Sequence, residues 1–122
     1  MSRDWLLYLS DLVESAEKIE RLLRGQTFES FRANEAVFDA VLFNLQIIGE
    51  AAKKLPEEAT RAMPGVDWSR PARLRDLIAH HYFAVDAGIV WDVAANRIPE
   101  VRAVAGALLT SLRSKGNPPP SQ

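Results

Sequence analysis

The sequence predicts an all-α fold, in the form of an antiparallel bundle of four to five helices. Apolar residues recur at helical spacing over several long stretches, and no stretch shows the alternation of a β-strand or a hairpin dipeptide. Glycine and proline separate these stretches. The 122 residues, 48% of them hydrophobic, are enough for one domain with a substantial core. We therefore expect antiparallel helices packed around a single apolar interior.

The first helix is expected to begin at Asp4, a potential cap, and to end at Gly25, a residue that suits a helix C-terminus. A short polar link around Gln26 and Thr27 follows it. The predicted buried stripe of this helix follows alternating steps of four and three residues through Trp5, Leu9, Leu12, Ala16, Ile19 and Leu23.

The second helix is predicted from near Asn34 to Leu55. Its polar residues follow the opposite face, but Asn44 lies off that polar stripe, so we expect its amide to bond to another helix. Gly49 costs about 1 kcal/mol relative to alanine inside a helix, and close approach of a neighbouring helix would explain it. The predicted apolar face consists of Val37, Val41, Leu45, Ile48, Ala52 and Leu55.

The second half of the chain is divided by residues that start or break helices. Met63-Pro64-Gly65 is a strong break. Residues 1–115 are predicted to be the helical domain, and the glycine- and proline-rich residues 116–122 a disordered tail. The last helix should bury Val101, Val104, Ala105, Leu108 and Leu112. Helix starts are predicted at or beside Pro56, Ser69, Asp86 and Pro99.

Composition excludes several classes of function. The chain has no cysteine, which excludes disulfides and thiolate metal sites and is compatible with a cytoplasmic location. Fifteen basic residues against sixteen acidic ones argue against unspecific coating of nucleic acid. Every apolar stretch is interrupted by charge and the start lacks a signal-peptide core, so neither a membrane span nor secretion is expected.

The residues best suited to chemistry lie in one run, from Arg75 to Tyr82. Arg75 supplies a permanent cation for phosphate oxygens, and His80 can exchange a proton near neutral pH. RNA carries its own nucleophile, the 2′-hydroxyl, so a base, an acid and a cation suffice for its cleavage. Neither a metal nor a cofactor is expected. Arg70 and Arg73 precede the run and are predicted to bind RNA phosphates.

Helix geometry restricts this interpretation. Five helical residues turn by about 140°, so Arg75 and His80 do not share a face of one straight helix. Either the helix bends near His80, or a symmetric dimer joins residues from two subunits. Two alternatives also stay open on the residues alone, namely a phosphate-binding module without catalysis and a structural dimer that uses Arg75, His80 and Tyr82 for packing.

The spacing Arg-x4-His-x-Tyr, formed by Arg75, His80 and Tyr82, resembles the signature of HEPN-domain ribonucleases. The wider context is similar to the HepT toxins of MNT–HEPN toxin–antitoxin systems over nearly the whole chain. That context comprises residues 48–56, Trp68, residues 75–83, residues 85–86 and residues 89–91.

The resemblance implies a homodimer whose motifs line a cleft between subunits, with metal-independent endoribonuclease activity that arrests growth. It implies Arg75 and His80 as the catalytic pair. It also implies a cognate antitoxin of the minimal nucleotidyltransferase kind, which transfers AMP onto the motif tyrosine, Tyr82. Many family members have asparagine after the arginine, where this chain has Asp76, a carboxylate that could hold Arg75 or orient His80. His81 occupies an unconstrained position.

Overall fold

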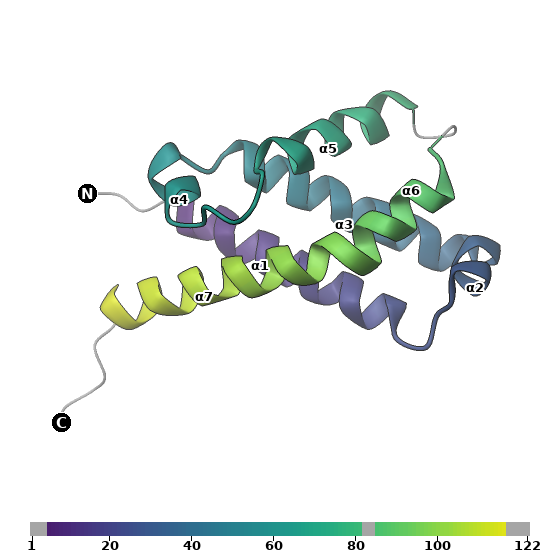
Figure 1. Ribbon diagram of the computed structural model, residues 1–122, viewed down its shortest axis with the longest axis horizontal. Coiled ribbons are helices and arrows are strands. Elements are labelled where there is room, and N and C mark those ends of the chain that lie inside the picture. The colour runs from purple at the N-terminus through teal and green to yellow at the C-terminus, as the bar shows by residue number, and fades with distance from the viewer. Residues whose placement is uncertain (1–4, 82–84, 117–122) are drawn as a thin grey trace.

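The computed structural model describes residues 5–81 and 85–116, and it confirms the all-α class. Its described residues form no strand (Figure 1). The helices are α1 (Trp5–Leu23), α2 (Phe28–Ala33), α3 (Glu35–Lys53), α4 (Glu57–Arg61), α5 (Ser69–His81), α6 (Ala87–Asp92) and α7 (Ile98–Gly116), with a π-helical segment, η2 (Val93–Arg97), between the last two.

The long helices pack in the spatial order α5, α3, α1, α7, because α3 contacts both α5 and α1, and α1 contacts α7. Each neighbouring pair runs in opposite directions (Figure 1). This order makes α3 a central helix, covered on two sides, and leaves α5 at the edge of the bundle. Among the described residues, no helix is both long and apolar enough to cross a membrane.

The core confirms the predicted stripes of α1 and α3. Leu9, Leu12 and Ile19 are fully buried in α1, and Val41, Leu45 and Ile48 are buried in α3. In α7 the buried stripe follows steps of four from Val101 to Ala105 and Leu109, whereas the predicted Leu108 is only half-buried.

The helix α2 was not predicted. Thr27 caps it by accepting from the backbone N–H of Ser30 at 3.1 Å, and Ser30 Oγ accepts from the Thr27 N–H at 2.9 Å. This reciprocal capping satisfies two otherwise unpaired donors and stabilises a helix of only six residues. Phe31 then enters the core with no exposed surface. Asn34, predicted at the start of the next helix, caps α3 through the N–H of Val37.

Two helix boundaries differ from the prediction. Ser69 is the first residue of α5 rather than its cap, and the Asp67 carboxylate accepts its N–H at 3.1 Å. The last helix begins at Ile98, beside Pro99 as predicted, but it is not separate, since α6, η2 and α7 follow one another without a break. The Ile98 N–H bonds to Val93 O, five residues back, and this wider turn accommodates a proline that would otherwise clash with the preceding turn.

Other boundary residues behave as predicted. Gly25 follows α1 in the left-handed conformation, with φ of 75°, which favours glycine. Pro56 is the N-cap residue of α4. Asp86 caps α6 by accepting from the N–H groups of Gly88 and Ile89 at 2.7 and 3.2 Å. Asp4 and the tail residues 117–122 lie outside the described residues.

Asn44 contradicts the prediction of a bond between helices. Its Nδ2 donates to Ala40 O, one turn earlier in the same helix, at 2.8 Å. Its Oδ1 is buried and has no hydrogen-bond partner in the described structure. The side chain is only 6% exposed, so this carbonyl oxygen loses its hydration without a replacement.

Candidate functional site

The site begins with the close contact between α3 and α5 at Gly49. A Cβ atom placed on Gly49 would lie 2.6 Å from Pro71 O and even closer to the Cβ of Arg75. Both are rigid atoms, so only glycine lets α5 approach this closely. The predicted reason for glycine at this position is therefore confirmed. This contact fixes how close Arg75 lies to the surface of α3.

Arg75 is held by two carboxylates. Its Nε lies 2.6 Å from Glu50 Oε1 on α3, and its Nη1 lies 3.3 Å from Asp76 Oδ1. The Arg75 side chain is 30% exposed, which leaves part of the guanidinium open to a ligand. A planar guanidinium fixed through Nε keeps its remaining N–H groups available as a phosphate-binding fork.

Asp76 also bonds to Lys53, whose Nζ lies 3.2 Å from Oδ1. The hydrogen bond from Lys53 is the largest cause that lowers the pKa of Asp76 below its ordinary value of 3.8, and Arg75 lowers this pKa further. Asp76 is therefore ionised at neutral pH. Because one carboxylate oxygen contacts both Lys53 and Arg75, the predicted possibility that Asp76 holds Arg75 matches the geometry.

His80 is oriented by the main-chain oxygen of Asp76. Its Nδ1 lies 2.8 Å from Asp76 O, one turn earlier in α5. A carbonyl oxygen can only accept, so Nδ1 carries the proton and the neutral ring keeps its lone pair on Nε2. The His80 side chain is exposed, so Nε2 can reach a substrate hydroxyl. Asp76 thus orients the imidazole through its backbone and not through its carboxylate.

Arg75 and His80 do not meet within one chain. The helix α5 runs without a break from Ser69 to His81, so both residues lie on one continuous helix, and a bend near His80 stays a prediction. Arg75 lines a groove of 290 Å³ between α1, α3 and α5, together with Tyr8, Phe43 and Glu50. Across the described residues, no hydrogen bond or ion pair joins Arg75 to His80.

Arg70 and Arg73 lie at the start of α5, away from Arg75. Arg73 Nη1 donates to Ser69 Oγ at 2.7 Å, and Arg70 Nε lies 3.5 Å from Asp67 Oδ2. The pKa of Asp67 is lowered first by its hydrogen bonds from Ser69 and then by Arg73 and Arg70. The three arginines do not converge on one point. Tyr82 and the side chain of His81 lie outside the described residues.

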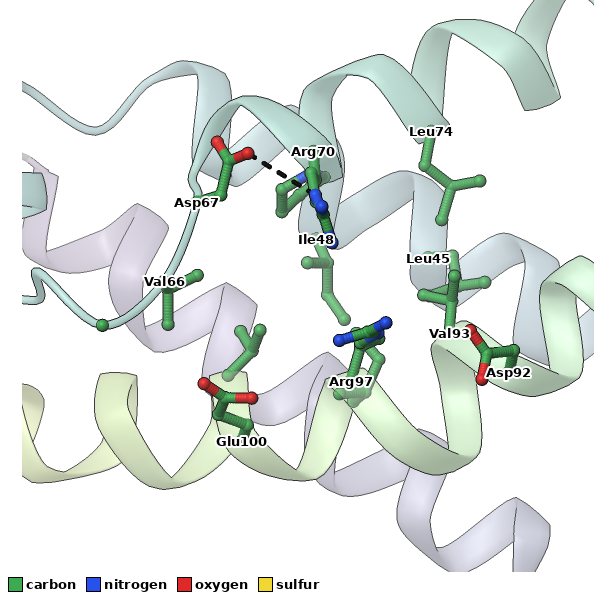
Figure 2. A pocket seen from close by; sticks show the side chains of 14 residues that line it. Leu45, Ile48, Val66, Asp67, Arg70, Leu74, Asp92, Val93, Arg97 and Glu100 are labelled. Carbon is green, nitrogen blue, oxygen red and sulfur yellow. Dashed lines mark ion pairs between the residues drawn. The ribbon is translucent and has the colours of Figure 1, made fainter.

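A larger pocket lies on the other side of α5, and the sequence did not predict it. We call it the Arg70–Arg97 pocket, after the two arginines at its mouth. Its volume is 440 Å³. In Figure 2, Arg70 from α5 and Arg97 from η2 extend from opposite sides of the pocket, and Ile48 belongs to α3 behind it. The pocket is lined by Leu45, Ile48, Gly65, Val66, Asp67, Arg70, Pro71, Leu74, Asp92, Val93, Arg97, Ile98, Glu100 and Val101.

The comparison with known families agrees with the motif residues. The family described as "Ribonuclease HepT-like" matches residues 12–108, which include the whole of α3 and α5. The chain belongs to the HepT-like ribonuclease family. No solved structure gave a significant match to it.

Several proteins are similar to this HepT-like chain over most of its length. A Methanocaldococcus jannaschii protein named as an RNase is 37% identical over 97 residues, covering 80% of each chain. A Thermococcus cleftensis protein named as a ribonuclease HepT is 37% identical over 102 residues, covering 84% of this chain and 93% of its own. A second RNase-named protein of M. jannaschii is 32% identical over 113 residues and covers 93% of each chain.

In this HepT-like chain, the motif residues depend on neighbours that motif spacing did not single out. Glu50 and Lys53 reach from α3 to Arg75 and Asp76. Both belong to the polar stripe of α3, three residues apart, so the sequence contained a signal for them. The sequence did not indicate the direction in which α5 crosses that stripe. Among the described residues, no group of three histidine or carboxylate side chains could hold a metal ion.

Proposed function

We propose that this protein is an endoribonuclease that cleaves RNA without a metal ion, with His80 and Arg75 as the catalytic pair. The observation that carries the proposal is the hydrogen bond between His80 Nδ1 and Asp76 O in an exposed histidine, which favours the tautomer with its lone pair on Nε2. Nε2 removes the proton of the 2′-hydroxyl, and the 2′-oxygen attacks the adjacent phosphorus. The bond to the 5′-oxygen breaks, this oxygen takes up a proton from water, and a 2′,3′-cyclic phosphate remains.

Arg75 stabilises the charge that develops on the phosphate oxygens. Its Nε is occupied by Glu50, so the guanidinium is oriented before RNA binds. Because Arg75 and His80 diverge in one chain, we propose that the active site forms in a homodimer, with each residue contributed by a different subunit.

Exposed apolar side chains near Arg75 and near His80 support this dimer. Phe43 is 63% exposed and lines the same groove as Arg75, and Leu77, one turn before His80 on α5, is 41% exposed. Apolar surface of this kind on a small domain favours a protein interface. A second copy of the chain can cover it, and a two-fold axis through this face would bring the His80 of each subunit toward the Arg75 of the other.

We further propose that the protein is the toxin of a toxin–antitoxin pair and acts on RNA in the cytoplasm. Its partner is a minimal nucleotidyltransferase that adds AMP to Tyr82. The tyrosine stands two residues after His80 in the chain, so an added phosphate would compete with RNA for Arg75. The family membership and this proximity in sequence support the control mechanism. Co-expression with the transferase should raise the intact mass by whole AMP units in the wild type and not in Tyr82→Phe.

The activity is tested with purified wild type, Arg75→Ala and His80→Ala on radiolabelled RNA in buffer with EDTA. Wild type should cut, and either substitution should lower the rate by about a hundredfold or more. Arg24→Ala, which removes an exposed arginine outside the candidate sites, is the matched control. RNA that stays intact with wild type under all conditions refutes the nuclease.

The dimeric site is tested by mixing the two inactive variants. If each site takes Arg75 from one subunit and His80 from the other, a mixed dimer has one complete site and one site without either residue. Random exchange of subunits should then restore roughly a quarter of wild-type activity. A mixture as inactive as its components would show that both residues act from the same subunit.

One observation favours a second candidate function. Arg75 is contacted by two carboxylates, Glu50 and Asp76, so part of its charge is already balanced before any phosphate arrives. This arrangement suits a helical partner that docks a nucleotide for the transferase and does not itself cleave RNA. Tight binding of ATP or the transferase by a protein that leaves every RNA intact would favour this candidate.

A further inference from the structure

We propose that the Arg70–Arg97 pocket is a subsite that binds one unstacked nucleotide of the RNA and prefers guanine. This inference rests on the proposed ribonuclease function, since RNA is the ligand. It assigns a role to a part of the molecule that does not include Arg75 or His80.

Much of the pocket lining is apolar, as contact with the face of a base requires. Leu45 and Ile48 of α3, Leu74 of α5, and Val93 and Val101 beyond it all contribute to the lining. Its 440 Å³ is within the range of small-molecule sites and exceeds what a single amino-acid side chain needs. Single-stranded RNA is recognised through bases that leave the stack and enter such sites.

The mouth of the pocket carries two guanidinium groups that extend from opposite sides of it (Figure 2). Arg70 has one loose ion pair, with Asp67 at 3.5 Å, and its side chain is 64% exposed. Arg97 is exposed and forms no ion pair or hydrogen bond within residues 5–81 and 85–116. Two like charges that converge on one space repel each other unless an anion lies between them, and a phosphate provides that anion.

Glu100 supplies the preference among bases. It lines the pocket one turn after Arg97, is exposed, and forms no hydrogen bond or ion pair with another described side chain. By contrast, Asp92 accepts from Asn96 at 2.8 Å and Asp67 accepts from Ser69. A free carboxylate offers two acceptor oxygens side by side. Among the four bases, guanine alone presents two adjacent N–H donors on one edge, which match this pair.

The position of the pocket fits an RNA strand that runs along α5. Arg70 and His80 are ten residues apart on one helix, which corresponds to about 15 Å along its axis. The pocket therefore lies at one end of α5 and the exposed imidazole at the other. An RNA strand held at its guanine in the pocket would present a phosphodiester a few nucleotides away to His80.

Binding is tested without cleavage, by titrating ¹⁵N-labelled full-length protein with GMP, AMP, CMP, UMP and inorganic phosphate. GMP should shift the amide signals of the lining residues, with affinity about tenfold above that of the other nucleotides, because it forms one more pair of charge-assisted hydrogen bonds. Arg97→Ala should weaken all nucleotides about tenfold or more. Glu100→Gln should remove only the preference for GMP.

The matched controls are Arg24→Ala and Glu17→Gln, which alter exposed residues outside the pocket and should change nothing. Shifts absent with every nucleotide, or equal for phosphate alone and GMP, would overturn the subsite. Equal affinities for the four nucleotides would overturn the guanine preference.

Cleavage mapping separates this inference from the proposed function. Wild type should cut at a fixed distance from guanosines, and Glu100→Gln should cut at comparable speed without that preference. Cleavage that ignores base identity in the wild type refutes the subsite and leaves the ribonuclease intact. GMP binding in a protein that cuts no RNA supports the pocket and refutes the ribonuclease.

Discussion

Replacement of Gly49 by alanine tests the close packing of α3 against α5. Alanine is favoured over glycine by about 1 kcal/mol inside a helix, so an open site would gain stability. At Gly49, however, the new methyl group would lie 2.6 Å from Pro71 O and closer to Arg75 Cβ. Neither atom can rotate away, so α5 must move, and overpacking of this kind costs about 1–3 kcal/mol. We therefore expect a net loss of up to about 2 kcal/mol in the free energy of unfolding.

Gly106 provides the matched control for this experiment. It lies in α7, and a Cβ placed there would meet no atom within 4 Å. Gly106→Ala should therefore raise the free energy of unfolding by about 0.5–1 kcal/mol. Urea unfolding followed by circular dichroism, at one fixed protein concentration, measures both variants. The reasoning is refuted if Gly49→Ala is stabilised as much as Gly106→Ala.

Three further predictions concern single side chains. Asn44→Leu should raise the free energy of unfolding, measured in urea, by about 1 kcal/mol, because it removes a buried carbonyl oxygen without a partner. A clear loss of stability would mean that Oδ1 is bonded in the protein. Asp76→Asn should be less stable than wild type at pH 7. The pKa of Asp76 is lowered on folding by Lys53 and Arg75. The difference in the free energy of unfolding between the two proteins should therefore be full above the ordinary pKa of 3.8 and vanish as the pH falls below it. A difference that stays constant down to about pH 3 would contradict this. Asp86→Ala should cost about 1 kcal/mol through loss of the cap of α6, and Asp86→Asn should recover most of it in the same unfolding assay.

The parts of the fold that follow from periodicity could be predicted from the sequence. The stripes of α1 and α3 depend only on which residues are apolar, and helix spacing places them on one face. Gly49 could be interpreted for the same reason, since glycine within an apolar helix indicates close packing. The cap at Asp86 required only a local rule, because an aspartate before a helical stretch accepts its first N–H groups.

The parts that depend on tertiary arrangement could not be predicted. The continuous run from α6 to α7 needed a π-helical turn before Pro99, and such turns have no simple sequence pattern. The bond of Asn44 to its own helix depended on the space left by α1. The Arg70–Arg97 pocket joins residues from three distant parts of the chain, so no local motif could reveal it. Residue types located Arg75 and His80, and helix geometry indicated that they diverge, but the contacts of Glu50 and Lys53 with this part of α5 could not be predicted.

The main chain and the side chain of Asp76 contact different residues: the main-chain oxygen accepts from His80, and the carboxylate contacts Arg75. Every amino acid has a main-chain oxygen, so the imidazole keeps its partner whichever residue follows the arginine. The side chain at that position is then free to vary, and what it changes is the net charge beside the guanidinium. Exchange of aspartate for asparagine there would change the charge beside Arg75 while leaving the orientation of His80 in place, so the two properties can vary independently.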